Sequence, residues 1–312
     1  MNEESLDSAA PSPQSERRDL LQRICALAAV GVASGGATIM GCGGGSSGGG
    51  VSFVAASGTA ATSGSSGTSG NPPAPPPAPP PSPSPAPPPA PASALPPGAP
   101  ALGAHGLNFH RLNTTAPSLS VSGLSTRTTG STLLVCVGRG NQSASATPTD
   151  NANNAFIQLD TAHAYTLYPG SGTALFAAEK AGGVAGHTVT VAKSDPLDEV
   201  TLTVVEITGG GLVRDVKWRE VLSGQPLTSP SVTTTSAALL VAWWWGDAGA
   251  DNDKTATPDS DFTVIDSVLA AGALVQCAVA VKQVSAAGTY NVTWTSTPQQ
   301  GAQLWLVAVQ AA

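Results

Sequence analysis

The stretch "HTVTVAKSDPLDEVTLTVVEIT", residues 187–208, carries the pattern that decides the fold. In its first part Val189 and Val191 alternate with threonine, and its second part alternates in the same way. A period of two puts successive side chains on opposite faces, which is typical of half-buried β-strands. With a proline-containing turn between the two parts, the stretch predicts strands over 187–193 and 199–208.

Further short apolar runs, separated by turn residues, lie on the N-terminal side at 132–138, 155–160 and 173–180. No stretch in this part of the chain combines helical spacing with helix caps. The sequence therefore predicts an all-β fold, a sandwich or jelly roll, over residues 103–312.

The stretch 186–207 has a counterpart of equal length at 288–309, with Gly first and Pro at the same position. Likewise "STLLVCVGRG" (131–140) resembles "SAALLVAWWWGD" (236–247). The two echoed halves could form tandem sandwiches or interleave as one. The short connection between them favours a single sandwich-like domain, since all-β domains of about 200 residues are common.

Five segments, in chain order, resemble a group of uncharacterised bacterial and phage β-sandwich modules: "GSTLLV", "TDNANNAF", "TALFAAEKA", "GHTVTV" and "VVEITGG". The shared pattern consists of core positions and turns, and it covers about 118–309. The resemblance implies a fold and carries over no catalytic residue.

The triplet "WWW" lies in a predicted strand, so Trp244 should point away from Trp243 and Trp245. One face would then join the core, and the other could offer an aromatic platform for sugar rings. Trp244 is thus a candidate ligand-binding residue, with a wholly buried triplet as the alternative. Cys277 alternates with Val275 and Val279, which puts it on an apolar strand face, and both a free thiol and a disulfide with Cys136 stay open.

The loop after this strand is rich in carboxylates, which are hard oxygen ligands that could hold Ca²⁺. EF-hand spacing is absent, and a solvated acidic loop is the alternative reading. The candidate calcium ligands are Asp247, Asp251, Asp253, Asp259 and Asp261. No other cofactor is expected.

The four histidines show neither HxH nor HExxH spacing, so a zinc site is unsupported. An enzyme would have to gather several titratable side chains around one concavity. The candidates are His163, His187, Glu179, Glu206, Asp150 and the acidic loop from Asp247 to Asp261. Nothing in the sequence marks a catalytic set, and a non-enzymatic role is favoured.

Net charge is −7 and no basic stripe is visible, which argues against nucleic acid as a partner.

The composition of residues 42–102 indicates a spacer that is first rich in Gly and Ser and then rich in Pro. No charge occurs between 43 and 102, and residues 71–100 contain seventeen prolines. Such a segment cannot bury a core, so we expect it to be disordered or extended.

Residues 1–41 have the layout of an export signal, with a charged start and an apolar run that ends in small residues. Arg17 and Arg18, followed by "DLL", resemble the twin-arginine pattern. "IMGC", which ends at Cys42, resembles the lipobox of bacterial lipoproteins, in which the cysteine receives diacylglycerol. Gly43 follows it, which implies passage to the outer membrane in a Gram-negative envelope.

Together these observations predict a lipid-anchored envelope protein that displays a β-sandwich module on a spacer. The expected role is binding or structural, with a glycan or other surface polymer as ligand. The alternative is an envelope hydrolase or lyase built on the same scaffold. The oligomeric state stays open.

Cys42→Ala should abolish incorporation of labelled palmitate and release the protein from the membrane fraction, because the thiol is the acceptor of the lipid. Ser46→Ala, a neighbouring change outside the lipobox, should leave both unchanged. Unaltered palmitate labelling of the Cys42 variant would exclude this residue as the anchor.

Overall fold

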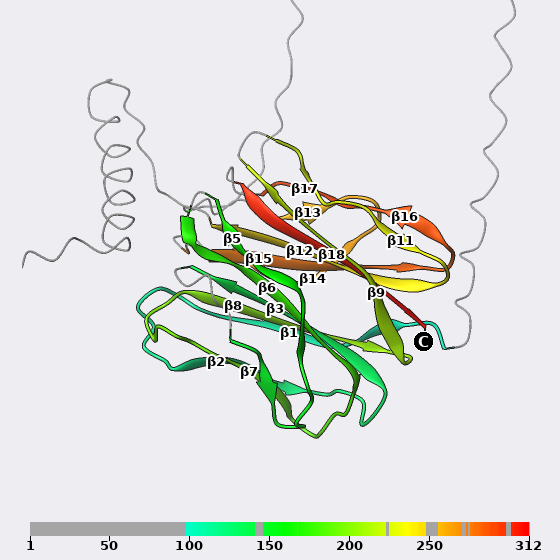
Figure 1. Cartoon of the computed structure of the whole chain (residues 1–312), viewed down its shortest axis with the longest axis horizontal. Helices are drawn as coiled ribbons and strands as arrows, with labels where there is room; N and C mark the ends of the chain where they lie inside the picture. Colours follow the sequence, from blue (N-terminus) through cyan, green and yellow to red (C-terminus); the bar gives the residue numbers. More distant parts are fainter. Residues whose placement is uncertain are drawn as a thin grey trace, which may run out of the picture. The chain divides into compact units, whose positions relative to one another are not determined.

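The computed structural model describes residues 98–311, apart from 141–145, 167, 223–224, 248–254, 270–272, 274 and 298–300. Every regular element within these ranges is a β-strand, and the all-β prediction is confirmed (Figure 1). Arg17, Arg18, Cys42 and the spacer as far as residue 97 lie outside the described residues. In the described part, no helix has the length and apolarity needed to cross a membrane.

The first half forms one large and one small antiparallel sheet. The large sheet has the order β1-β8-β3-β6-β5, and the small sheet has the order β2-β7-β4. The bounds of the strands are β1 Ala101–His110, β2 Ser118–Leu124, β3 Ser131–Arg139, β4 Thr149–Asp150, β5 Ile157–Tyr165, β6 Tyr168–Ala181, β7 His187–Ala192 and β8 Val200–Thr208.

The second half repeats this plan. Its large sheet has the order β9-β18-β12-β15-β14, and its small layer consists of β10-β17-β13 and β11-β16. The bounds are β9 Gly211–Val221, β10 Leu227–Thr228, β11 Val232–Thr234, β12 Ala238–Asp247, β13 Thr257–Pro258, β14 Thr263–Val268, β15 Val275–Val284, β16 Gly288–Tyr290, β17 Thr293–Thr295 and β18 Ala302–Ala311.

In each half the chain passes back and forth between the large and the small sheet, which is the course of a jelly roll. The two large sheets pack face to face, so that four layers result (Figure 1). The prediction of a sandwich built from two echoed halves is confirmed. Interleaving of strands is wrong, because each described sheet takes all its strands from one half. The expected connection 209–230 contains β9, an edge strand of the second half.

Three apolar cores follow from the four layers. One core fills the first jelly roll and another fills the second. The third lies between the two large sheets and combines residues of both halves. Strands of the large sheets are covered on both faces, which explains runs such as "LLVCV" and "ALLVAWWW" that show no polar alternation.

Indole rings of the second half hold the central core together. Trp243 donates its Nε1–H to Thr203 Oγ1 over 2.8 Å, across the two sheets. Trp305 does the same to Thr173 Oγ1, also over 2.8 Å. Trp245 lies over Gly138, where any Cβ would overlap its indole ring.

Of the two alternatives for "WWW", the wholly buried triplet is correct and the exposed platform is wrong. Trp244 does point away from its two neighbours, but it packs into the core of the second jelly roll. All three indoles are 0% exposed, because sheets cover both faces of β12. Trp244 therefore offers no surface platform.

We predict that the halves 98–209 and 210–312 do not form soluble monomers when expressed separately, although each has a core of its own. Each would expose the apolar face that the other covers, and such faces associate. Co-expression should restore a soluble one-to-one complex, measured by size-exclusion chromatography with light scattering. Two soluble monomers, each unfolding cooperatively alone, would show that the central core is dispensable.

Candidate functional site

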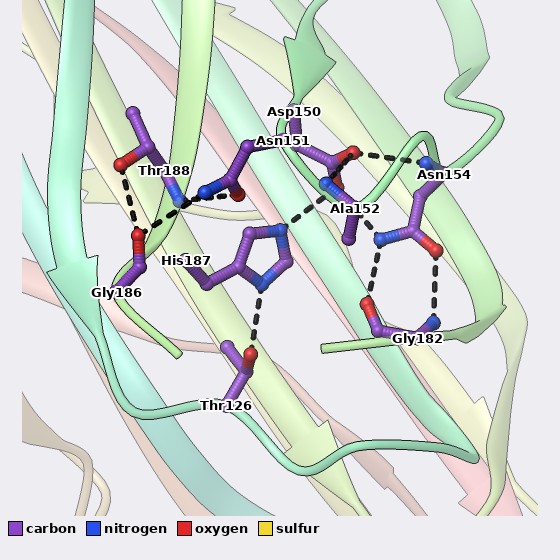
Figure 2. Close-up of polar contacts among 9 residues, drawn as sticks. All are labelled: Thr126, Asp150, Asn151, Ala152, Asn154, Gly182, Gly186, His187 and Thr188. Carbon is purple, nitrogen blue, oxygen red and sulfur yellow. Dashed lines mark hydrogen bonds and ion pairs between the residues drawn. The ribbon is translucent and has the colours of Figure 1, made fainter. Parts of the chain in front are cut away.

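His187 occupies the centre of a buried polar cluster at one end of the first jelly roll (Figure 2). It begins β7, next to β4, which ends with Asp150. Asp150 pairs with Val189 across β4 and β7, and this pairing brings the side chains of Asp150 and His187 together. Thr126 approaches from the loop between β2 and β3.

The imidazole bridges a carboxylate and a hydroxyl. His187 Nε2 lies 2.9 Å from Asp150 Oδ2, and its Nδ1 lies 2.8 Å from Thr126 Oγ1. A carboxylate only accepts, so Nε2 carries the proton shared with Asp150. At Nδ1 the partner is the hydroxyl of Thr126, a group that can either donate or accept a hydrogen bond.

Asp150 is satisfied by four donors. Oδ1 accepts the backbone N–H groups of Ala152 at 3.2 Å and Asn154 at 2.9 Å. Oδ2 accepts the side-chain amide of Asn154 at 2.7 Å as well as His187 Nε2. Asn154 also exchanges two hydrogen bonds of 2.8 Å with the backbone of Gly182, as a neighbouring strand would. The cluster thus joins three loops at this end of the sandwich.

The order hydroxyl, imidazole, carboxylate matches the arrangement that activates a nucleophile in acyl transfer. In such an enzyme the substrate has to reach the imidazole, whereas here the side chains of His187 and Asp150 are both 0% exposed. Buried polar groups that are fully hydrogen-bonded fix the conformation of loops. The geometry therefore supports a structural role for this cluster.

Two other carboxylates that an enzyme would have had to gather into one site also hold backbone segments. Glu206, which is buried, accepts hydrogen bonds from Ala104 N, Arg127 N and Ser131 Oγ at 2.6–2.9 Å. Glu179 accepts the N–H of Val213 at 2.8 Å and so links β6 of the first half to β9 of the second. Neither carboxylate joins the His187 cluster.

His163 lies at the edge of the central sandwich. A bulge in β5 precedes it, and its ring stacks on Trp218 of β9 with a centroid distance of 3.6 Å and an interplanar angle of 4°. Its Nε2 lies 3.0 Å from Asp160 Oδ2, and Asp160 is half exposed. This corner brings an aromatic ring and a carboxylate close to solvent.

The predicted calcium loop is described only at its end. Asp251 and Asp253 lie outside the described residues, as does the side chain of Asp247. Asp259 accepts the N–H of Thr293 at 2.8 Å, and Asp261 is 96% exposed with Lys282 Nζ at 3.7 Å. In the described ranges no three His, Cys, Asp or Glu side chains gather as metal ligands would.

Cys136 and Cys277 are buried free thiols in the central core. Burial, with Cys277 as the second cause, raises the pKa of Cys136 well above its ordinary value. Burial also raises the pKa of Cys277, and Asp266 adds to this effect. Neither thiol has the depressed pKa of a nucleophile.

No family model, no curated protein and no solved structure matches this chain.

Sequence reasoning missed several polar residues of the first jelly roll. Thr126 and Asn154 belong to the His187 cluster, and "TDNANNAF" contained the signal, since Asn and Asp favour turns that bond their own backbone. Arg139 and Asp198, buried at the opposite end, were not marked by any motif.

We expect His187→Ala to lower the free energy of unfolding by about 2–4 kcal/mol, because it removes a hydrogen bond from the buried carboxylate of Asp150 and one from the partly buried hydroxyl of Thr126. Thr188→Ala, the adjacent control, keeps its backbone bond to Asn151 and should cost less than about 1 kcal/mol. Urea titration measures both. Equal stability of wild type and the His187 variant would contradict a structural role.

Proposed function

We propose that this chain is a lipid-anchored cell-envelope protein that displays its tandem jelly-roll module on a long spacer. In this proposal residues 1–41 direct export by the twin-arginine route, and Cys42 carries the lipid. Residues 42–102 hold the module away from the membrane, most naturally the outer membrane. The module binds a glycan or another surface polymer.

The anchor and spacer are supported by the sequence alone. The lipobox-like "IMGC", the uncharged Gly/Ser segment and the seventeen prolines of 71–100 follow one another in the order that display requires. Polyproline II extends about 3.1 Å per residue, so the Pro-rich part could span roughly 90 Å.

The ligand class is supported by one observation, the corner formed by Trp218, His163 and Asp160. Trp218 is partly exposed, and the neighbouring carboxylate of Asp160 is half exposed. Apolar ring faces beside polar planar groups suit sugar rings, which present C–H faces and hydroxyl edges. β5 and β9 are edge strands of the two large sheets, so this corner is built on strands rather than on a loop.

A rival proposal is an envelope hydrolase or lyase. The hydrogen-bonded order Thr126–His187–Asp150 favours it. The complete burial of His187 and Asp150 counts against it, because a substrate has to reach the hydroxyl and the imidazole.

A chain that begins at residue 43, and so lacks the lipid, should bind at least one envelope polysaccharide on a glycan array. Trp218→Ala and Asp160→Asn should each weaken that binding about tenfold, since stacking and one hydrogen bond each contribute about 1–1.5 kcal/mol. Tyr290→Ala, a partly buried aromatic on β16, is the matched control and should bind normally. Failure of the unmutated chain to bind any polysaccharide would reject the glycan proposal and leave the anchor proposal standing.

A further inference from the structure

Strand β9 is an edge of the second large sheet and carries a row of cations. It pairs with β18 on one side, and no described strand pairs with it on the other. Arg214, Lys217 and Arg219 of β9 are all exposed, and they are three of the ten lysines and arginines between residues 103 and 312. We call these three side chains the basic edge. Their concentration on one short stretch stands out because the chain as a whole has a net charge of −7.

A β-bulge turns the first of these cations outward. Ala308 of β18 pairs with Asp215, and the next residue, Val309, pairs with Val213. Arg214 is therefore the extra residue of the bulge, without a partner of its own on β18. Bulges at sheet edges re-aim side chains, and this one presents Arg214 to solvent.

The other two cations alternate with aromatic and aliphatic residues. Val216 and Trp218 are partly buried and pack against the central core. Lys217 and Arg219 therefore point to the other face of the sheet, and their long stems can bring the charged groups to the free edge. Along the strand, a cation thus lies on each side of Trp218, the ring that forms the proposed glycan corner.

Carboxylates of the same strand are used by donors of the protein itself. Asp215 accepts the N–H of Thr233 at 2.9 Å, and Glu220 accepts the N–H of Thr166 at 2.6 Å. Lys217 Nζ lies 3.0 Å from Asp215 Oδ1, but the lysine side chain is 47% exposed and that of the aspartate only 16%. The carboxylates of β9 are thus directed inward, whereas the cations are directed outward.

The guanidinium groups of Arg214 and Arg219 form no ion pair with a carboxylate in the described ranges. A guanidinium presents its N–H donors as a planar fork that matches a carboxylate. Charge on an edge strand also discourages pairing with another sheet, but carboxylates would serve that purpose equally well. Protection of the edge therefore leaves the outward position of the cations unexplained.

We propose that the basic edge binds the carboxylates of an acidic polysaccharide built from uronic acids. The inference rests on the proposed function, in which a glycan stacks at Trp218, and it names the class of that glycan. A uronic acid carries its carboxylate on the ring that stacks, so one sugar can contact the indole and a neighbouring guanidinium together. A phosphate-linked polymer carries its charge between the rings and matches this spacing less well.

The length of the basic edge suits a linear polymer. At about 3.3 Å per residue, the strand advances about 16 Å between Arg214 and Arg219. A single sugar cannot contact both guanidinium groups over this length, whereas successive sugars of one chain can. Binding should therefore require an oligomer, and free galacturonic acid should not compete with it.

Calorimetric titration of the lipid-free chain that begins at residue 43 tests the proposal. Polygalacturonate should bind, and its fully methyl-esterified form, which has the same rings without the charge, should bind at least about tenfold more weakly. A phosphomannan, as the phosphate-linked polymer, should also bind more weakly than polygalacturonate. Raising the NaCl concentration from about 0.05 to about 0.5 M should weaken the polygalacturonate complex about tenfold, because salt screens exposed charges.

Arg214→Gln and Arg219→Gln should each weaken the binding of polygalacturonate about fivefold and reduce its salt dependence. Arg111→Gln is the matched control, since it removes the same charge from an exposed residue. Arg111 follows β1, at the opposite edge of the first large sheet from β5, and its variant should bind normally. Urea titration checks that the three variants remain folded.

Equal binding of the charged and the methyl-esterified polymer would overturn the inference and leave the glycan proposal standing. The same holds for tighter binding of the phosphomannan, and for Arg214 and Arg219 variants that bind like the wild type. If none of these polysaccharides and no other polysaccharide binds, the proposed function fails and the inference fails with it.

Discussion

The insertion of indole rings from one jelly roll into small-residue positions of the other is the interaction on which the architecture depends. Trp243 meets Thr203, Trp305 meets Thr173, and Trp245 covers Gly138. Each indole is fully buried, and a ring of this size removes about 150–250 Å² from water. The hydrogen bonds to threonine satisfy two buried N–H groups and also fix the position of the rings. Together these contacts determine how the two large sheets lie on each other.

The two halves are similar in topology and complementary in side-chain size. Cys136 pairs with Thr203 across β3 and β8, and Trp243 pairs with Trp305 across β12 and β18. These strands occupy equivalent places in their sheets, so the small residues of one half correspond to the indoles of the other. Two identical sheets could not interlock in this way, because indole would meet indole at close-packed density. The divergence of the halves at these positions is what lets them share a core.

The sequence predicted much of this fold and missed a register. The echo between 186–207 and 288–309 is structurally correct, since Val205 and Val307 both face the central core. The echo of the two "LLV" runs is displaced by one residue, because Leu133 faces its own jelly roll whereas Leu239 faces the central core. A displacement by one reverses every side chain of a strand. Runs that are apolar at every position hide this displacement, since both faces of these strands are covered.

The candidate site was only partly predictable for a related reason. His187 and Asp150 were recognised as titratable residues, but their contact arises from the pairing of β7 with β4, across a separation that no motif records. Thr126 and Asn154 are ordinary loop residues until those strands bring them together. Arg139 in "VGRG" and Asp198 in "PLDE" look like solvated turn residues, although the structure buries both.

The two ends of the first jelly roll show what burial alone leaves undecided. The side chains of Asp150 and Asp198 are both fully buried, and they lie at opposite ends of the same sandwich. Asp150 accepts four hydrogen bonds, so its charge is part of the stable fold. The carboxylate of Asp198 has no comparable set of donors, and burial raises its pKa to about 6 although Arg139 and a backbone hydrogen bond from Glu199 favour its ionised form. A carboxylate with a full set of donors stiffens the loops that it joins, whereas one with fewer donors carries a desolvation cost that the rest of the fold has to offset.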